Sequence, residues 1–130
     1  MSKTSLLIAV VDDEESVRKA LSRLLRSVGM TGETFAGGAE FLQSLADHKP
    51  DCVVLDMHMP GVTGFDVLVR LAATQAPPPV VVITGHDSAE TYERALAAGA
   101  VAYLRKPIND QALLDAIAAG MAPVGKKTKP

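Results

Sequence analysis

Short runs of consecutive apolar residues alternate along the chain with stretches in which apolar residues recur at helical spacing. The apolar runs lack the polar alternation of a strand with one face in water, which is typical of parallel strands covered on both faces. Three runs are strong and two further stretches are weaker, so the sequence predicts five strands. The strong runs are Leu6–Val11, Cys52–Leu55 and Val80–Ile83, and the weaker ones are Thr31–Phe35 and Val101–Leu104.

The segments between these runs predict five helices. In the first, apolar residues recur at helical spacing from Val17 to Val28, which places them on one face of a helix. Gly29 follows, and glycine commonly ends a helix. Apolar residues indicate the other four helices around positions 41–45, 65–71, 92–98 and 113–121.

Alternation of strands and helices implies a parallel sheet with right-handed crossovers and helices on both faces, which is an α/β doubly wound fold. The length of 130 residues argues for a single domain with its own core. We expect this domain to span residues 1–122, and residues 123–130 to form a flexible tail. In open sheets of this class, functional groups gather beyond the carboxyl ends of the strands.

Chemically distinctive residues follow four of the predicted strands. The carboxyl ends of parallel strands meet at one edge of a sheet, and these four strands are neighbours if the strand order is 2-1-3-4-5. Three carboxylates, a hydroxyl and an ammonium group should then converge on one shallow pocket. The residues are Asp12 and Asp13 after the first strand, Asp56 after the third, Thr84 at the end of the fourth and Lys106 after the fifth.

Each of these residues also has an ordinary structural explanation. Asp12 or Asp13 is equally consistent with capping the first helix, where an acidic side chain suits the helix dipole. A threonine in a strand and a lysine on the surface need no functional role. Their combined occurrence at the ends of four strands is poorly explained by chance.

Three crowded carboxylates repel one another and favour a bound cation. Hard oxygen ligands with room for water are typical of Mg²⁺ rather than of zinc or copper. Asp56, held beside Mg²⁺ and the Lys106 ammonium, suits a nucleophile toward phosphorus, because the two cations would neutralise the phosphoryl oxygens. The Thr84 hydroxyl can donate a hydrogen bond to one of those oxygens.

Composition narrows the range of partners. The formal net charge is −2 and the basic cluster lies at the C-terminal end, so nothing indicates nucleic-acid binding by this chain alone. No apolar run approaches the ~20 residues of a membrane helix, so we expect a cytoplasmic protein without membrane contact. Cys52 is the single cysteine and lies in an apolar run, which favours a buried hydrophobic role over a reactive thiol.

From about Leu6 to Met121, the chain resembles the receiver domain of two-component response regulators. The motifs that carry the resemblance are VVDDEESVRKAL, VVLDMHMPGVTGFDVL, VVVITGHD and ALAAGAVAYLRKPI, in that order. The chain is most similar to the branch that includes nitrogen-fixation-type transcriptional regulators. The resemblance implies a flavodoxin-like fold with strand order 2-1-3-4-5. It also implies a signalling phosphoacceptor, and not an enzyme beyond self-phosphotransfer and autodephosphorylation.

The resemblance further implies roles for individual residues. Asp56 would accept a phosphoryl group from a sensor histidine kinase or a phosphotransfer protein. Asp13 and Asp56 would bind Mg²⁺, with Asp12 close by and the backbone carbonyl of His58 as a further ligand. Lys106 would bind the phosphoryl group.

The family also implies a conformational switch. Thr84 would sense the phosphoryl group, and Tyr103 occupies the position of the aromatic residue that turns inward when Thr84 moves. The face formed by the fourth helix, the fifth strand and the fifth helix would then bind an output partner or a second copy of the chain. Plain packing at the end of the fifth strand remains an alternative for Tyr103.

Other readings of the chain stay open at this point. His58 and His86 would flank the mouth of the pocket, and we hypothesise that one of them tunes the lifetime of the phosphoryl group. A phosphatase of the dehalogenase class also uses a strand-end aspartate with Mg²⁺, but it has a second aspartate where this chain has His58. A flavin- or nucleotide-binding module and a degenerate receiver are further alternatives. A flavin- or nucleotide-binding module would have a glycine-rich loop after the first strand, which this chain lacks. The intact set of site residues argues against a degenerate receiver.

Overall fold

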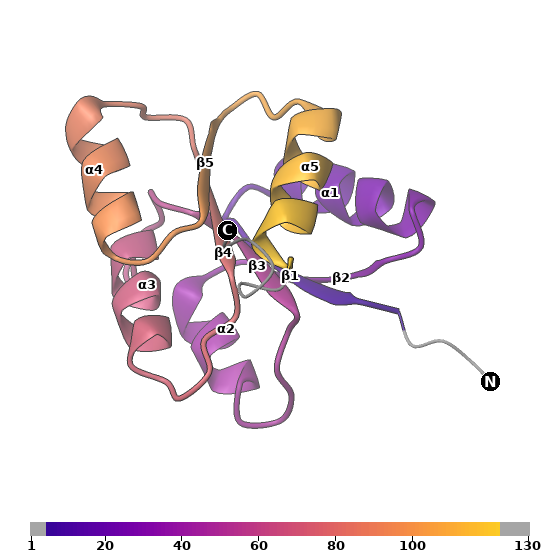
Figure 1. Ribbon diagram of the computed structural model, residues 1–130, viewed down its shortest axis with the longest axis horizontal. Helices are drawn as coiled ribbons and strands as arrows, with labels where there is room; N and C mark the ends of the chain where they lie inside the picture. Colours follow the sequence, from indigo (N-terminus) through magenta and orange to yellow (C-terminus); the bar gives the residue numbers. More distant parts are fainter. Residues whose placement is uncertain (1–4, 123–130) are drawn as a thin grey trace, which may run out of the picture.

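The computed structural model describes residues 5–122, in which five strands alternate with five helices (Figure 1). The alternation predicted from the apolar pattern is confirmed. The predicted tail, residues 123–130, lies outside the described residues and stays a prediction. The elements are β1 (Leu7–Val11), α1 (Glu15–Ser27), β2 (Thr31–Phe35), α2 (Gly38–Ser44), β3 (Cys52–Asp56), α3 (Gly64–Ala72), β4 (Val80–Thr84), α4 (Ala89–Ala97), β5 (Ala102–Arg105) and α5 (Asp110–Gly120).

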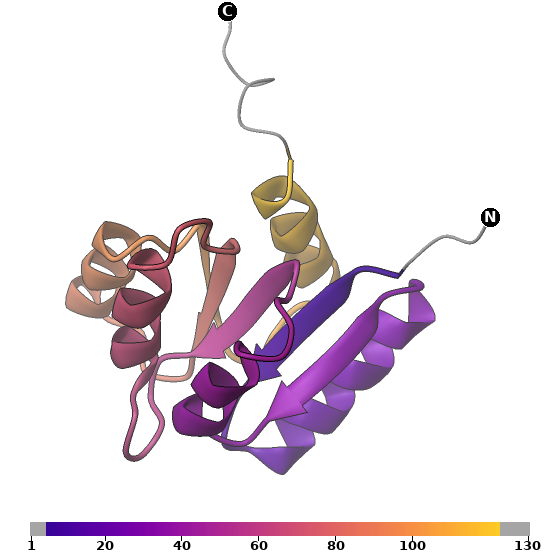
Figure 2. The ribbon, with the colours of Figure 1, turned by 90° about the horizontal axis from the view of Figure 1, so that it is seen from below.

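The five strands form one parallel sheet in the order β2-β1-β3-β4-β5, which confirms the predicted order. Figure 2 shows the arrows of β1, β2 and β3 running in the same direction. The register pairs Val11 with Leu55, and Asp56 with Ile83. The residues that follow β1, β3 and β4 therefore emerge at the same edge of the sheet.

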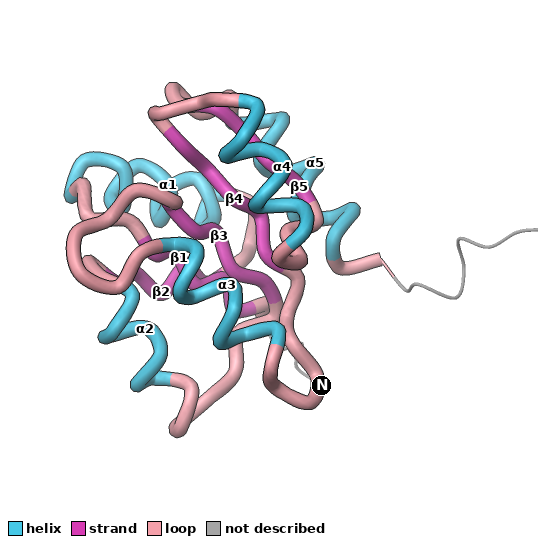
Figure 3. Tube along the Cα trace, turned by 90° about the vertical axis from the view of Figure 1, so that its left-hand side faces the viewer, coloured by secondary structure: helices cyan, strands magenta, loops and turns pink. Residues whose placement is uncertain are grey.

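Helices cover both faces of the sheet, which explains why the central strands carry almost no polar residues. α1 and α5 cover one face, while α2, α3 and α4 cover the other, which is turned toward the viewer in Figure 3. Successive residues of β3 point to opposite layers: Cys52 packs with α1 and α5, and Val53 with the other three helices. Burial raises the pKa of the Cys52 thiol to about 12, as expected for a core residue rather than a nucleophile.

Three of the helices begin at side chains that cap the free backbone N–H groups. Thr63 and Asp66 form a reciprocal capping box at the start of α3. Ser88 accepts from a backbone N–H of α4, and Asn109 does the same for α5. Gly29, with φ of 85°, follows the end of α1 as predicted. None of the helices within residues 5–122 has both the length and the apolar character needed to cross a membrane.

The chain turns back tightly between β3 and α3. A Cβ atom on Gly64 would lie 2.5 Å from the backbone oxygen of Asp56 and 2.6 Å from the Cα atom of Met57. The Gly64 N–H also donates to the Met57 carbonyl at 3.3 Å. Because the crowding atoms belong to the main chain, the absence of a side chain at Gly64 helps to fix the backbone that carries Asp56.

Replacing this glycine should therefore be costly. We expect Gly64→Ala to lower the free energy of unfolding by about 2–3 kcal/mol, because backbone rather than a flexible side chain has to move. Gly37→Ala is the matched control, since the nearest atom to its added Cβ is 3.9 Å away, and it should cost less than about 1 kcal/mol. Urea unfolding followed by circular dichroism gives both values. Equal destabilisation of the two variants would contradict the close approach at Gly64.

Candidate functional site

A cluster of carboxylates lies at the edge where β1 and β3 end. Asp12 and Asp13 directly follow β1, and Asp56 is the last residue of β3. Each of the three places a carboxylate oxygen within 4.8 Å of the other two. Asp12 and Asp56 are buried, whereas Asp13 is exposed. A cavity of about 360 Å³ opens at this edge, and it is lined by Asp13, Glu14, Asp56, His58, Gly85, His86 and Lys106.

Lys106 reaches the cluster from the loop that follows β5. Its Nζ atom lies 2.8 Å from Oε1 of Glu14 and 3.0 Å from Oδ2 of Asp12. Oδ2 of Asp56 is more distant, at 3.8 Å. The peptide bond between Lys106 and Pro107 is cis. One ammonium group therefore faces several carboxylates, and its shortest contacts are with Glu14 and Asp12.

Asp12 is held by contacts on both its side chain and its main chain. Its Oδ1 accepts a hydrogen bond from the N–H of Glu14 at 2.9 Å. The other carboxylate oxygen, Oδ2, is buried and accepts no hydrogen bond of good geometry, although Lys106 lies 3.0 Å away, so that contact is an ion pair. The N-cap of α1 is Glu14, without a side-chain capping bond. Neither Asp12 nor Asp13 caps α1, and that alternative is wrong.

The donor set suits a divalent cation. Asp12, Asp13 and Asp56 offer only carboxylate oxygens, and the buried Oδ2 of Asp12 has no hydrogen-bond donor. The adjoining cavity leaves space for water molecules. Carboxylate oxygens combined with water are the ligands that Mg²⁺ prefers in proteins. The residues present therefore fit the magnesium ion that the sequence predicts.

The buried position of Asp56 disfavours its charged form. Burial raises the pKa of Asp56 to about 6, and the negative charge of Asp12 adds to this effect. The Lys106 ammonium opposes the rise, as does the N–H of His58, which donates to Oδ1 of Asp56 at 3.3 Å. A cation bound between the carboxylates would favour the ionised form of Asp56.

The Lys106 side chain remains positively charged throughout the pH range in which Asp56 gains or loses its proton. Burial alone would lower the pKa of Lys106, but the hydrogen bond to Glu14, the close contact with Asp12 and the charge of Asp56 raise it overall. The hydrogen bond from Lys106, followed by its positive charge, lowers the pKa of the exposed Glu14. A permanent positive charge therefore faces the cavity at neutral pH.

Thr84, the last residue of β4, lies beside the same cavity with its side chain buried. Its Oγ1 accepts a hydrogen bond from the N–H of His86 at 2.9 Å and lies 3.2 Å from Nδ1 of His58. The two imidazole rings pack against each other with a centroid distance of 4.6 Å. Burial, followed by the charges of His86 and Lys106, lowers the pKa of His58. Both histidines line the cavity, which is the placement that the sequence predicted.

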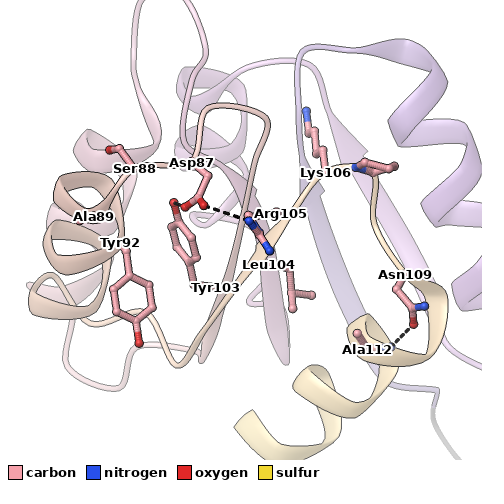
Figure 4. A pocket seen from close by; sticks show the side chains of 11 residues that line it. Asp87, Ser88, Ala89, Tyr92, Tyr103, Leu104, Arg105, Lys106, Asn109 and Ala112 are labelled. Atoms are coloured by element: carbon pink, nitrogen blue, oxygen red, sulfur yellow. Dashed lines mark hydrogen bonds and ion pairs between the residues drawn. The ribbon is translucent and has the colours of Figure 1, made fainter.

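Tyr103 lies at a second and larger cavity, of about 780 Å³, between α4, β5 and α5. Its hydroxyl donates to Oδ1 of Asp87 at 2.8 Å, and its ring packs edge-on against Tyr92. Nη1 of Arg105 lies 3.4 Å from the other oxygen of Asp87. Figure 4 shows Tyr103 and Arg105 directed toward Asp87, while Lys106 points away from them. Tyr103 is thus tethered to the loop before α4 by a hydrogen bond in addition to its packing.

Three side chains at the site were not identified from the sequence. Glu14 binds Lys106, Arg18 donates to the carbonyl oxygen of Asp12 at 2.9 Å, and Asp87 accepts from Tyr103. All three residues lie within the motifs that carry the family resemblance, but only Glu14 and Asp87 lie within three residues of a predicted site residue at a strand end, so their proximity to the site was visible. Arg18 lies one turn into α1, and a helical pattern gives no sign of where a long side chain folds back.

Comparison with known families decides between the alternatives. The model of the response regulator receiver domain matches residues 8–118 of the chain. The chain belongs to this family. Membership places the protein among the domains of signalling response regulators and sets aside the phosphatase and flavin-binding readings.

Relatives and solved structures agree with this assignment. The receiver domain is 40% identical over 118 residues to Nodulation protein W of Bradyrhizobium diazoefficiens, covering 91% of this chain and 52% of that protein. Transcriptional regulatory protein FixJ of Azorhizobium caulinodans is 35% identical over 117 residues, with 90% and 56% covered. A receiver protein from Burkholderia phymatum superposes with a TM-score of 0.81 at 48% identity, covering 90% of this chain and 95% of that chain.

These relatives confirm the similarity to nitrogen-fixation-type regulators. The receiver domain spans about half the length of the curated relatives that it matches, 52% of Nodulation protein W and 56% of FixJ.

The raised pKa of Asp56 predicts a stability effect in metal-free buffer. At pH 7.5 the folded chain holds an ionised buried carboxylate, so Asp56→Asn should raise the free energy of unfolding by about 1–3 kcal/mol. As the pH falls through 6 toward 4, the folded wild type takes up the proton that the unfolded chain still lacks. The wild type should then gain stability and the difference between the two proteins should shrink.

Urea unfolding in the presence of a chelator, at several pH values, measures this difference. Asp13→Asn is the matched control, because the Asp13 side chain is exposed, and its effect should be much smaller. Millimolar Mg²⁺ should stabilise the wild type more than Asp56→Asn, since the variant lacks one of the carboxylates. A gap between wild type and Asp56→Asn that stays constant from pH 7.5 to pH 4 would contradict the electrostatic explanation.

Proposed function

We propose that this receiver domain is the phosphoacceptor of a two-component phosphorelay. Asp56 takes a phosphoryl group from a histidine of a partner kinase or phosphotransfer protein, with Mg²⁺ as the cofactor. The observation that carries the proposal is the convergence of Asp12, Asp13 and Asp56 with the Lys106 ammonium beside an open cavity. An ordinary surface cluster of acids would not bury two carboxylates around a lysine.

The transfer itself needs little from the protein beyond position and charge. An oxygen of Asp56 forms a bond to phosphorus while the bond from phosphorus to the partner's imidazole nitrogen breaks, and the imidazole leaves with the electron pair. Asp13 and Asp56, with Asp12 close by and the backbone carbonyl of His58 as a further ligand, would hold Mg²⁺, which would supply positive charge beside the phosphoryl oxygens. Lys106 supplies the second positive charge.

The contacts of Lys106 support a change of partners on phosphorylation. In the resting chain its ammonium is closer to Glu14 and Asp12 than to Asp56, at 2.8, 3.0 and 3.8 Å. A phosphoryl group adds roughly −1.5 to −2 charge and three acceptor oxygens next to it. The ammonium then exchanges its contact with exposed Glu14 for a phosphoryl oxygen.

Intact mass after incubation with acetyl phosphate and Mg²⁺ tests the phosphoacceptor. We expect the wild type to gain one phosphoryl group and Asp56→Asn to gain none. Chelation of Mg²⁺ should abolish the gain. Asp13→Asn should slow the gain, because it removes a proposed metal ligand but leaves the nucleophile. A phosphoryl group that still appears on Asp56→Asn would overturn the assignment.

The second part of the proposal concerns the output. Thr84 moves toward the phosphoryl group, Tyr103 turns inward, and the face of α4, β5 and α5 changes its affinity for an output partner or a second copy. The tether between Tyr103 and Asp87 supports this part, because Asp87 follows Thr84 by only three residues. The large cavity on this face and the exposed side chains of Tyr92 and Leu96 offer a contact surface. A cytoplasmic location and the lack of nucleic-acid binding stay predictions.

Tyrosine fluorescence can report the proposed movement of Tyr103 with little emission from other residues. The chain has no tryptophan and two tyrosines, so Tyr92→Phe leaves Tyr103 as the single reporter. The Asp87 carboxylate that accepts from the phenol quenches its emission in the resting state. Addition of beryllofluoride, a phosphoryl mimic, with Mg²⁺ should raise the emission and reduce quenching by iodide as the ring turns inward.

The control combines Tyr92→Phe with Asp56→Asn, which should not respond to beryllofluoride. Adding Asp87→Ala to Tyr92→Phe should give high emission before any addition. No change in the Tyr92→Phe protein at saturating beryllofluoride would show that Tyr103 does not move.

A further inference from the structure

His58 touches both ends of the proposed switch. Its backbone N–H donates to Oδ1 of Asp56 at 3.3 Å, and its ring Nδ1 lies 3.2 Å from Oγ1 of Thr84. No other residue in the described part of the chain forms hydrogen bonds with the side chains of both Asp56 and Thr84. The residue two positions after the proposed phosphoacceptor therefore links it to the hydroxyl that must later respond to it.

The tautomer of His58 sets the direction of its hydrogen bond with Thr84. Oγ1 already accepts from the N–H of His86 at 2.9 Å, and the Thr84 side chain is fully buried. A hydroxyl has a single proton to donate, and Nδ1 of a neutral imidazole accepts when the ring proton is on Nε2. In that tautomer of His58 the Thr84 hydroxyl donates to Nδ1 across the 3.2 Å contact, and the same proton is the one that a phosphoryl oxygen would need.

The His58 ring is supported in this position. The ring of His86 packs against it at a centroid distance of 4.6 Å, with an angle of 56° between the planes. The N–H of His86 holds Thr84 from the other side. Moving Thr84 toward Asp56 therefore requires breaking its bond to His58, and the stacked ring resists following it.

We propose that His58, with its ring proton on Nε2, is a positioning residue that holds Thr84 in the resting conformation by accepting a hydrogen bond from the Thr84 hydroxyl at Nδ1. The proposal rests on the proposed function of Asp56 and adds a regulatory element to that site. His58 does not touch the transferred group in this role. It acts through Thr84, by competing with the phosphoryl group for one proton, so it sets the free-energy difference between the resting and the switched state.

Two variants separate the hydrogen bond from the bulk of the ring. His58→Leu keeps a branched side chain of moderate size but has no acceptor. His58→Asn places an amide atom on Cγ where the imidazole carries Nδ1, so it can restore the bond to Thr84. The backbone N–H to Asp56 is unchanged in both variants.

The measurement is the dissociation constant of beryllofluoride at saturating Mg²⁺. We expect His58→Leu to bind it about fivefold more tightly than the wild type, which is the size expected for the loss of one neutral hydrogen bond. His58→Asn should return the dissociation constant to within about twofold of the wild-type value. The tighter binding should appear in the dissociation constant. A higher association rate alone is not sufficient, because a wider cavity mouth would also raise that rate.

A double-mutant cycle with Thr84→Val provides the decisive control. Valine has the shape of threonine but no hydroxyl, so in this background His58→Leu should leave the dissociation constant unchanged. If the gain persists with Thr84→Val, His58 acts by access to the cavity and the proposal is wrong. Equal affinities for wild type and His58→Leu, or weaker binding by His58→Leu, would also overturn it.

These outcomes are distinct from failure of the proposed function. If the wild type does not bind beryllofluoride with Mg²⁺, the proposed phosphoacceptor function is wrong, and the proposed role of His58 is wrong with it. If the wild type binds beryllofluoride and His58→Leu has no effect on the affinity, the phosphoacceptor function stands and only the proposed role of His58 is wrong.

Discussion

Repulsion between buried carboxylates at one edge of the sheet is the constraint on which the rest of the site depends. Asp12 and Asp56 end neighbouring strands, so the register of β1 and β3 forces them together, and burial removes the water that would screen them. Lys106 offsets part of this repulsion but is shared among three acids. Burial and then the charge of Asp12 still raise the pKa of Asp56, and this remaining imbalance would favour a bound cation.

The aliphatic core makes this arrangement tolerable. The central strands β1, β3 and β4 are almost entirely buried between two layers of helices, so their ends cannot spread apart to relieve the repulsion. The close approach of Gly64 to the main chain at Asp56 adds a further restraint. Added charge at such a site on a rigid support should produce a sharp response, which is what the proposed phosphorylation switch requires.

The sequence predicted the strongly buried parts of the fold better than the edges. β1, β3 and β4 read as continuous apolar runs because both of their faces are covered. β2 and β5 were weaker predictions because they are edge strands with half-exposed residues, and β5 begins at Ala102 instead of the exposed Val101. The strand order came from the family resemblance, since periodicity within a strand carries no information about its neighbours. Asp12, Asp56 and Thr84 were predictable because they end strands, whereas the contacts of Glu14, Arg18 and Asp87 depend on how loops and long side chains fold back.

The loop after β4 explains how an event at Asp56 can reach a face formed by other elements. Thr84, His86 and Asp87 lie within four consecutive positions, and each is bound to a different part of the molecule. Thr84 is linked to His58 beside Asp56, His86 stacks on His58, and Asp87 holds Tyr103 and Arg105 of β5. In a loop this short, a displacement of Thr84 also displaces Asp87, because the three intervening steps along the chain offer few backbone torsions to absorb the movement. The proposed coupling between the carboxylate cluster and β5 would therefore follow from chain connectivity and a few hydrogen bonds, with no need for a pathway through the core.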